Sequence, residues 1–578
     1  MAGVFKIASQ VDIVSPEIKL RPSSEVMQLA RLGSSFQTRI SFMRQLIRRM
    51  NCEGWRIRRE QFALNDEGYG KALYIVSTPK RSYSLVCFSH YLEPKRRTDR
   101  VIAEAWDATF SLFDGEPHGS DISRLENQTP RQEGGRFQAS ELVMSRANKS
   151  LRLFDRVVNS LAFGTQPDTD AINEIGYLMR TTAVYANGKF GMADRTRYAD
   201  RPELAPPYQA EMLAVYMIRR FSLDLVEHVA RCKNPSRYVP LDRRLKRHIG
   251  IGNATGLGMA PFLVSHPMLI HNWFHARETA LAKIRSLEAP ASDQLKHFRK
   301  LIKQAALHIA EWKIEDEKHR ARITALTNGL QLLTEWTGKG SKIFEAPRPW
   351  DVLYKTAVGA VCIEAQELLV SLILEPYPEH TDELGDTLHV DREMAFEPKI
   401  SVAEFCAIVD QYYSWALDVD FNDPQQSKYF WYYSNEKIEP RRGVRHEEAG
   451  AEKEMQIAIA RDVQSLRETL ESANSKEIMA VFLLRHPELR HTVKRVMIGA
   501  QHEYSEIQDN IIADTCRPID ILRCKLAFFG ATKFDPKSDL WTRVTMYQGA
   551  PLDDELDRDD TDNWGFPVKP VSKLCKSR

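Results

Sequence analysis

The sequence predicts a mainly α-helical protein with a small N-terminal antiparallel β-meander, an α+β fold. Two helical halves, which an internal duplication would relate, are expected to be joined by a long helix. Three observations support this prediction. Alternating apolar and polar residues occur only between about residues 55 and 90, helical periodicity dominates after Asp99, and a heptad-like apolar pattern extends from Asp293 to Trp336.

The N-terminal region, residues 1–130, is expected to contain one helix followed by the meander. A helical pattern begins after Ser23 and continues to about Met50. Three alternating stretches follow it, separated by the turn-like sequences NDEGYG and PKR; they are WRIRREQFAL, KALYIVST and SYSLVCFSH. Such short alternating runs between turn residues are typical of antiparallel strands.

Residues 291–340 are expected to form the long connecting helix. Asp293 is a suitable N-cap, and glycine and proline are absent until Gly329. Apolar residues recur at three- and four-residue spacing on both sides of a polar gap, at Leu295, Phe298, Ile302, Ala305, Ile309, Trp312, Ile323, Leu326, Leu330 and Leu333. We interpret this pattern as a helix that buries one stripe within the chain. The alternative is a coiled coil that assembles a homo-oligomer.

An internal duplication would relate the helical half at residues 131–290 to the half at residues 341–530. The segment from Met259 to His271 matches the segment from Met479 to His491 at eight of thirteen positions without a gap. Two weaker matches occur in the same order: ASELVMS resembles AQELLVS, and YANGK resembles YSNEK. Residues 531–578 would then form an acidic and basic C-terminal tail.

The overall composition excludes several functional classes. The 80 basic and 78 acidic residues nearly balance, which argues against a nucleic-acid-binding protein. No apolar run is long enough to cross a membrane, and the N-terminus lacks the pattern of a signal peptide. The eight cysteines form no C-x-x-C motif and are scattered, as is typical of a reducing compartment. We therefore expect a cytoplasmic location.

A glycine-rich segment after a basic run is the first candidate site. Gly252, Gly256 and Gly258 would permit close approach of the backbone to a ligand, and Asn253 and Thr255 add polar side chains. The preceding basic residues would attract an anion; they are Arg243, Arg244, Lys246, Arg247 and His248. The glycine spacing fits neither the dinucleotide-binding nor the P-loop fingerprint. The alternative is a plain glycine-rich connection between helices.

The segment from Arg180 to Arg201 is the second candidate. Arg195 and Arg197 would bind a carboxylate or phosphate, and Asn187 and Lys189 would act in catalysis, with Lys189 transferring a proton. The alternative is a solvated hairpin with ordinary surface charges.

Three glutamates are further candidates. Glu141, on an expected helix SELVMSRANKSLRLFDR, is a candidate general base if that helix lines a cleft. Glu364 and Glu367 lie in the apolar stretch AVCIEAQELLVSLIL, where a carboxylate requires a partner or a raised pKa. They are either functional acids or members of structural ion pairs.

A metal site is the remaining candidate. His271 and His275 are four residues apart on an expected helix, and Glu278 follows one turn later. No further ligand is identifiable, so no metal is assigned, and the cofactor stays undetermined. The sequence therefore predicts an enzyme that acts on a small anionic metabolite by acid–base chemistry. The alternatives are an assembly protein that uses residues 293–336 and a metal-dependent enzyme that uses the histidines.

Overall fold

The computed structural model describes residues 18–96, 105–127, 138–183, 200–256, 266–388, 399–420, 459–507, 517–538, 541–557 and 563–570, together with residues 397, 423, 431–434 and 439–442. No helix within these ranges has both the length and the hydropathy needed to cross a lipid bilayer.

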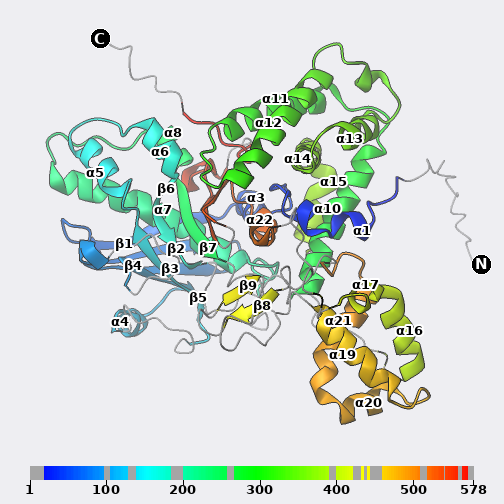
Figure 1. The fold of residues 1–578 in the computed structure, drawn as a ribbon. Helices are drawn as coiled ribbons and strands as arrows, with labels where there is room; N and C mark the ends of the chain where they lie inside the picture. Colours follow the sequence, from blue (N-terminus) through cyan, green and yellow to red (C-terminus); the bar gives the residue numbers. More distant parts are fainter. Residues whose placement is uncertain are drawn as a thin grey trace, which may run out of the picture.

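A nine-stranded mixed sheet lies at the centre of the fold (Figure 1), in the order β1-β2-β3-β4-β5-β6-β7-β11-β10. Its strands are β1 (Arg56–Leu64), β2 (Gly70–Ser77), β3 (Ser82–Ser89), β4 (Ala108–Asp114), β5 (Glu141–Lys149), β6 (Tyr177–Thr181), β7 (Gly250–Gly256), β10 (Lys533–Pro536) and β11 (Trp541–Met546). All neighbouring strands are antiparallel except β6 and β7, which are parallel. A separate hairpin consists of β8 (Trp431–Ser434) and β9 (Glu439–Arg442).

The predicted fold class is therefore wrong. The three expected strands are present and pair in antiparallel fashion, but they form only one end of a much larger sheet. The sequence signal was absent from the central strands because side chains on both of their faces are buried. β5 is an example: its residues were expected to be helical, yet seven of its nine residues are buried and none is exposed.

The glycine-rich segment is also a strand rather than a loop. Residues 250–256 form β7, between β6 and β11. A Cβ atom at Gly252 would lie 2.6 Å from the ring of Tyr177, and one at Gly250 would lie 2.3 Å from the carbonyl oxygen of Met546. These glycines therefore permit close packing inside the sheet.

Helices from the first half of the chain, together with one helix near the C-terminus, enclose the main core. α7 contacts β4, β5, β6 and β7, and α3 and α5 pack against it. The helices of this layer are α1 (Ser23–Val26), α2 (Leu29–Leu32), α3 (Phe42–Cys52), α5 (Phe154–Ala162), α6 (Thr169–Ile175), α7 (Gln209–Lys233), α8 (Arg243–His248) and α22 (Pro518–Phe529). α4 (Gly119–Asn127) packs through Leu125 on a separate small core of β2 and β3. The single N-terminal helix expected before the meander is thus three short helices.

The predicted long helix is a hairpin of two helices. A second helical group, with its own core, consists of α10 (Pro267–Arg285), α11 (Ser292–Ala310), α12 (Glu317–Trp336), α13 (Pro349–Ala360), α14 (Ile363–Leu374) and α15 (Pro378–Asp386). The helix is interrupted before Asp316. The Asp316 carboxylate accepts a hydrogen bond from the backbone N–H of His319, at 2.8 Å, and so caps the start of α12. Both apolar stripes then pack against α14 inside the chain.

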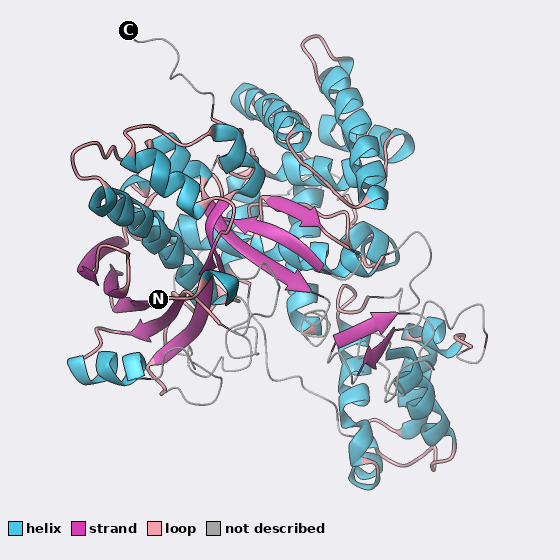
Figure 2. Ribbon diagram, turned by 60° about the vertical axis from the view of Figure 1, so that its left-hand side comes forward, coloured by secondary structure: helices cyan, strands magenta, loops and turns pink. Residues whose placement is uncertain are grey.

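A third group of helices forms a small module, which Figures 1 and 2 both show away from the sheet, at the lower right. It consists of α16 (Val402–Tyr412), α17 (Ser414–Leu417), α19 (Ile459–Glu471), α20 (Met479–Arg485) and α21 (Arg490–Gln501), and it has a separate core.

The proposed duplication does not describe this architecture. ASELVMS overlaps strand β5, whereas its proposed equivalent AQELLVS lies in helix α14. The backbones of His266 and His486 do agree, with φ of −120° and −123° before a helical proline. Residues 259–265, the larger part of the first copy, lie outside the described residues. The expected C-terminal tail supplies β10 and β11 to the sheet.

Candidate functional site

The points where the two sequence-predicted site segments begin lie at one edge of the sheet. β6 and β7 are parallel neighbours, so their carboxyl ends, near Thr181 and Gly256, lie at the same edge. The segment 184–199 follows β6 and the segment 257–265 follows β7. β5 is antiparallel to β6, so the N-terminal half of β5 lies at this edge as well. Asn187, Lys189, Arg195, Arg197 and Gly258 lie outside the described residues; only the points where their segments begin are placed.

Three arginines share one face of the sheet near this edge. Arg180 on β6 is opposite Asn148 on β5, two residues from Arg146. On its other side Arg180 is opposite Gly252, and Ala254, two residues along β7, is opposite Arg543 on β11. Opposed residues point to the same side of a sheet. Arg146, Arg180 and Arg543, with Gly252 and Ala254 between them, are called the arginine face below.

The small residues of β7 shape this face. Strands are about 4.8 Å apart, so Arg180 and Arg543 arise from backbones about 10 Å apart. Between them β7 contributes only Gly252 and Ala254, and neither has a long side chain. The guanidinium of Arg146 lies 5.6 Å from the centre of the Trp106 ring. Arg180 is 7% exposed.

The connection between α11 and α12 lies close to this face at β11. A hydrogen bond from Lys537, together with the positive charges of Lys537 and Arg543, holds the pKa of Glu315 below its usual range. The Nζ atom of Lys537 is 2.7 Å from Oε1 of Glu315. The positive charge of Arg543 therefore reaches the carboxylate of Glu315, whose direct partner is Lys537.

The predicted anion-binding residues of β7 divide between the two faces. Gly252, Ala254 and Gly256 are every second residue of β7 and point to the same side, so both glycines belong to the arginine face. Asn253 and Thr255 point to the opposite face and are 3% and 1% exposed. The Nδ2 atom of Asn253 donates to the carbonyl oxygen of Thr181 at 2.9 Å, so this side chain joins β7 to β6.

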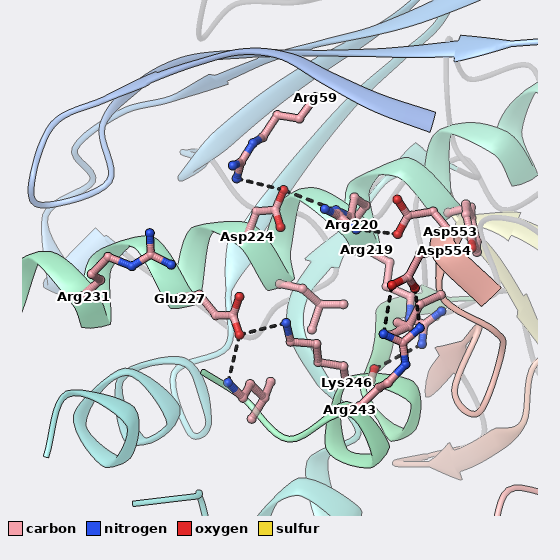
Figure 3. Close-up of a pocket in the computed structure, with 14 residues that line it drawn as sticks. Arg59, Arg219, Arg220, Asp224, Glu227, Arg231, Arg243, Lys246, Asp553 and Asp554 are labelled. Atoms are coloured by element: carbon pink, nitrogen blue, oxygen red, sulfur yellow. Dashed lines mark hydrogen bonds and ion pairs between the residues drawn. The ribbon is translucent and has the colours of Figure 1, made fainter. Parts of the chain in front are cut away.

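The basic run lies at the other end of β7, about 20 Å from its carboxyl end by the rise of a seven-residue strand. It forms α8, which borders a pocket of about 330 Å³ (Figure 3). Acidic residues from the segment that was expected to be a tail line this pocket as well. Arg243 pairs with Asp554 at 2.6 Å, and Lys246 pairs with Glu227 of α7 at 2.8 Å. Arg243 therefore holds the C-terminal segment, Lys246 holds α8 on α7, and neither lies at the arginine face.

Glu141 does not join the arginines. It is fully buried at the start of β5, and its carboxylate pairs with Arg124 of α4 and accepts from the backbone N–H of Gln138 at 3.2 Å. Five residues of extended strand, about 16 Å, separate it from Arg146. Its carboxylate is thus committed to holding α4 on the sheet.

Glu364 and Glu367 belong to buried ion-pair networks. Glu367 pairs with Arg21 at 2.7 Å, Arg31 at 2.8 Å and also Arg277, and these charges hold its pKa well below its usual range against the effect of burial. Glu364 pairs with Arg523 at 2.7 Å and with Arg322 at 3.0 Å. Both glutamates join segments that are distant in sequence. They are therefore members of structural ion pairs, which was the alternative to functional acids.

The histidine pair does not present a metal site. The backbone N–H of Tyr504 donates to Nδ1 of His271 at 3.2 Å, so the proton of a neutral His271 is on Nε2, the other possible ligand atom. Glu278 binds Arg21 through both carboxylate oxygens, each at 2.7 Å. Within the described ranges, no group of three or more His, Cys, Asp or Glu side chains is arranged to hold a metal ion.

The arginine face was missed by the sequence interpretation. Arg146 lay in an expected helix and Arg543 in an expected tail, so nothing indicated that they share a sheet with Arg180. The available signal was the alternation in ELVMSRANK, in which Met144, Arg146 and Asn148 fall on one side. A comparison with known proteins found no family model, no curated protein and no solved structure that matches this chain.

Proposed function

We propose that the protein is an enzyme that acts on a small carboxylated or phosphorylated substrate bound at the arginine face. One observation carries this proposal. Four neighbouring strands bring Arg146, Arg180 and Arg543 to one face, beside the edge where the two sequence-predicted site segments begin. In open sheets, ligands bind beyond the carboxyl ends of parallel strands.

The chemistry of the face suits an anion. A guanidinium group offers a planar fork of donors that matches a carboxylate or a phosphate. The ring of Tyr177 packs against Gly252, so the guanidinium groups, rather than the backbone of β7, would contact a ligand between the arginines. Arg195, Arg197 and Gly258 are retained in the proposal as further anion contacts from the adjoining segments.

Proton transfer is assigned to Lys189, with Asn187 as its neighbour. Lys189 follows Ala183, the last described residue after β6, by six residues, which extend at most about 20 Å. This length is sufficient to bring an amine over the arginine face. A lysine amine near several guanidinium groups has a lowered pKa and can act as a base or nucleophile. Glu141 is omitted because Arg124 holds its carboxylate.

The proposed compartment is the cytoplasm, and the proposed partner is the small anion alone. Six cysteines among the described residues are free thiols, which suits a reducing environment. An assembly role for residues 293–336 has less support, because Phe298, Leu326 and Leu333 of that stripe are each completely buried within the chain.

The proposal is tested by measuring binding and turnover separately. Inorganic phosphate, pyrophosphate and citrate are titrated while the melting temperature is followed, since a ligand of the native state raises it. Arg180→Met and Arg146→Met should weaken binding about tenfold to a hundredfold. Arg180→Lys keeps the charge and serves if Arg180→Met fails to fold. Arg56→Met, at a largely exposed position on β1, is the matched control.

Turnover is measured by incubating the protein with a mixture of phosphorylated and carboxylated metabolites and following each by mass spectrometry. Lys189→Ala should abolish consumption of the substrate while leaving anion binding unchanged. Equal anion binding by wild type, Arg146→Met and Arg180→Lys would overturn the proposed site. Anion binding at the arginines with no consumed metabolite would leave a binding protein and refute the enzyme.

A further inference from the structure

A second pocket lies at the joint between the helical module and the rest of the chain. Its volume is about 470 Å³. α10 borders it on one side, and α16, α17 and the end of α21 border it on the other. It belongs to neither the arginine face nor the basic pocket of Figure 3.

Aromatic rings form one wall of this pocket. Tyr412, Tyr413 and Trp415 follow one another at the α16–α17 junction, and the ring centres of Tyr413 and Trp415 are 5.8 Å apart at an angle of 34°. Tyr412 is 42% exposed, so its ring is accessible to a ligand. Tyr413 packs tightly, because a Cβ atom at Gly499 would lie 2.4 Å from its hydroxyl oxygen.

Carboxylates lie opposite the rings. Glu503 and Glu506 line the pocket, and no lysine or arginine is among the described residues that do so. Arg495 pairs with Glu506 and neutralises it, and the Tyr413 hydroxyl donates to Glu506 at 3.2 Å. Glu503 is exposed and supplies the pocket with a negative charge.

The imidazole of His271 adds no positive charge at the inner end of the pocket. His271 accepts a hydrogen bond from Tyr504, and burial, with the neighbouring His502 and His275, lowers its pKa to about 4. His271 is therefore neutral at neutral pH. Its ring centre is 4.7 Å from that of His502 and 5.4 Å from that of His275.

We propose that this pocket binds an organic cation, specifically an alkylated ammonium group held by the Tyr412 and Trp415 rings and by the Glu503 carboxylate. The faces of aromatic rings attract cations, and a set of such rings with a nearby carboxylate is suited to an ammonium that carries methyl groups. A ligand in this pocket would contact both α10 and the helical module, and would therefore hold the two together. This inference does not depend on the proposed function.

The test is calorimetric titration of the full-length protein with choline, tetramethylammonium and neopentyl carbinol. The last compound has the shape of choline with carbon in place of nitrogen, so it carries no charge. We expect the cations to bind about tenfold or more tightly than this neutral isostere. Equal binding of choline and neopentyl carbinol, or no binding of either cation at millimolar concentration, would overturn the proposal.

Single substitutions test whether choline binds in this pocket, and exposed positions are chosen so that the variants fold. Trp415→Ala and Tyr412→Ala should each weaken choline binding at least about fivefold, and Glu503→Gln should remove most of the preference for the cation. Tyr412 and Glu503 are exposed, so their variants should fold. Tyr91→Ala, an exposed tyrosine beside Tyr69, is the matched control and should bind as wild type does. Unchanged choline binding by Tyr412→Ala and Glu503→Gln would refute the assignment.

The source of the cation is distinguished by a further titration with a peptide that contains trimethyllysine. Tighter binding of the peptide than of choline supports a methylated protein as the partner. Equal binding supports a free small molecule. Both results support an alkylammonium site, and binding of the unmethylated peptide as tight as that of the methylated one would contradict it.

Discussion

Arg21 and Glu367 are separated by 346 residues in sequence, yet Nη1 of the arginine is 2.7 Å from Oε1 of the glutamate. Both side chains are almost completely buried, and Arg21 also binds Glu278. Arg31 and Arg277 complete the network around Glu367. The contact joins the segment before α1 to α10 and α14, so charge pairing holds the N-terminal segment on the second helical group.

Glu367→Gln should destabilise the protein by about 3–5 kcal/mol, because it leaves buried guanidinium groups without their shared carboxylate. The pKa of Glu367 is depressed in the folded state. Its stabilising effect is therefore present above the ordinary glutamate pKa, about 4.3, and is lost progressively as the pH falls below it. Urea denaturation of both proteins at several pH values measures the difference.

Glu25→Gln is the matched control for this substitution. Glu25 pairs with Arg31 at 3.3 Å, but its side chain is 36% exposed. A partly exposed pair of this kind contributes less than about 1 kcal/mol. Similar losses of stability in the two variants would contradict the structural role assigned to burial of Glu367.

Arg219→Met should cost more than about 3 kcal/mol of folding free energy. Arg219 is 2% exposed, and its hydrogen bonds go to the carbonyl oxygens of Lys246, Arg247, Ile249, Ala550 and Pro551. Methionine fills the space but removes the guanidinium donor from the carbonyl oxygens of Lys246, Ile249 and Ala550. Those of Arg247 and Pro551 keep hydrogen bonds from Gly549 and Tyr216. Arg231→Met, at an exposed position on the same helix, should change the free energy of unfolding by less than about 1 kcal/mol. Calorimetric melting distinguishes the two.

Gly252→Ala should destabilise the sheet by about 1–3 kcal/mol, because the new methyl group would overlap the buried ring of Tyr177. Gly359→Ala is the control: it lies in α13, where nothing is within 4 Å of an added Cβ atom. There the better helix propensity of alanine should stabilise the protein by up to about 1 kcal/mol. A destabilising Gly359→Ala or a neutral Gly252→Ala would show that close packing is not the reason for the glycine in β7.

The three strands that could be predicted are bounded by clear turn sequences. β1 has no fully buried residue, and β2 and β3 are buried on both faces, but the turn residues between the three strands marked where each begins and ends. β5, β6 and β7 have buried side chains on both faces, and periodicity does not distinguish such strands from buried helices. The break at Asp316 was missed because an aspartate inside an apolar repeat is equally compatible with a polar seam position and with an N-cap.

Only part of the candidate site could be predicted, because the sequence shows local motifs but not which strands become neighbours. The segments after β6 and β7 were singled out by their glycines, arginines and lysine, and the parallel pairing places their starting points together. Arg543 could not be associated with Arg180 from the sequence, because 363 residues separate them and only sheet order brings β11 beside β7. Likewise, the basic run and the acidic segment near Asp554 were recognised separately, but nothing local indicated that they pair.

Glu211→Gln should stabilise the protein at neutral and alkaline pH. Glu211, in the first turn of α7, is 3% exposed, and burial raises its pKa from 4.5 to about 7. Between these values the unfolded state ionises while the folded state keeps the proton, so the stability of the wild type falls as the pH rises. The shift corresponds to about 3 kcal/mol above pH 7. Free energies of unfolding from urea titrations should therefore differ little near pH 4 and diverge up to pH 7. Glu60→Gln, on the exposed side of β1, should show no such pH dependence. A constant difference between wild type and Glu211→Gln across this range would mean that the carboxyl group is ionised in the folded state throughout.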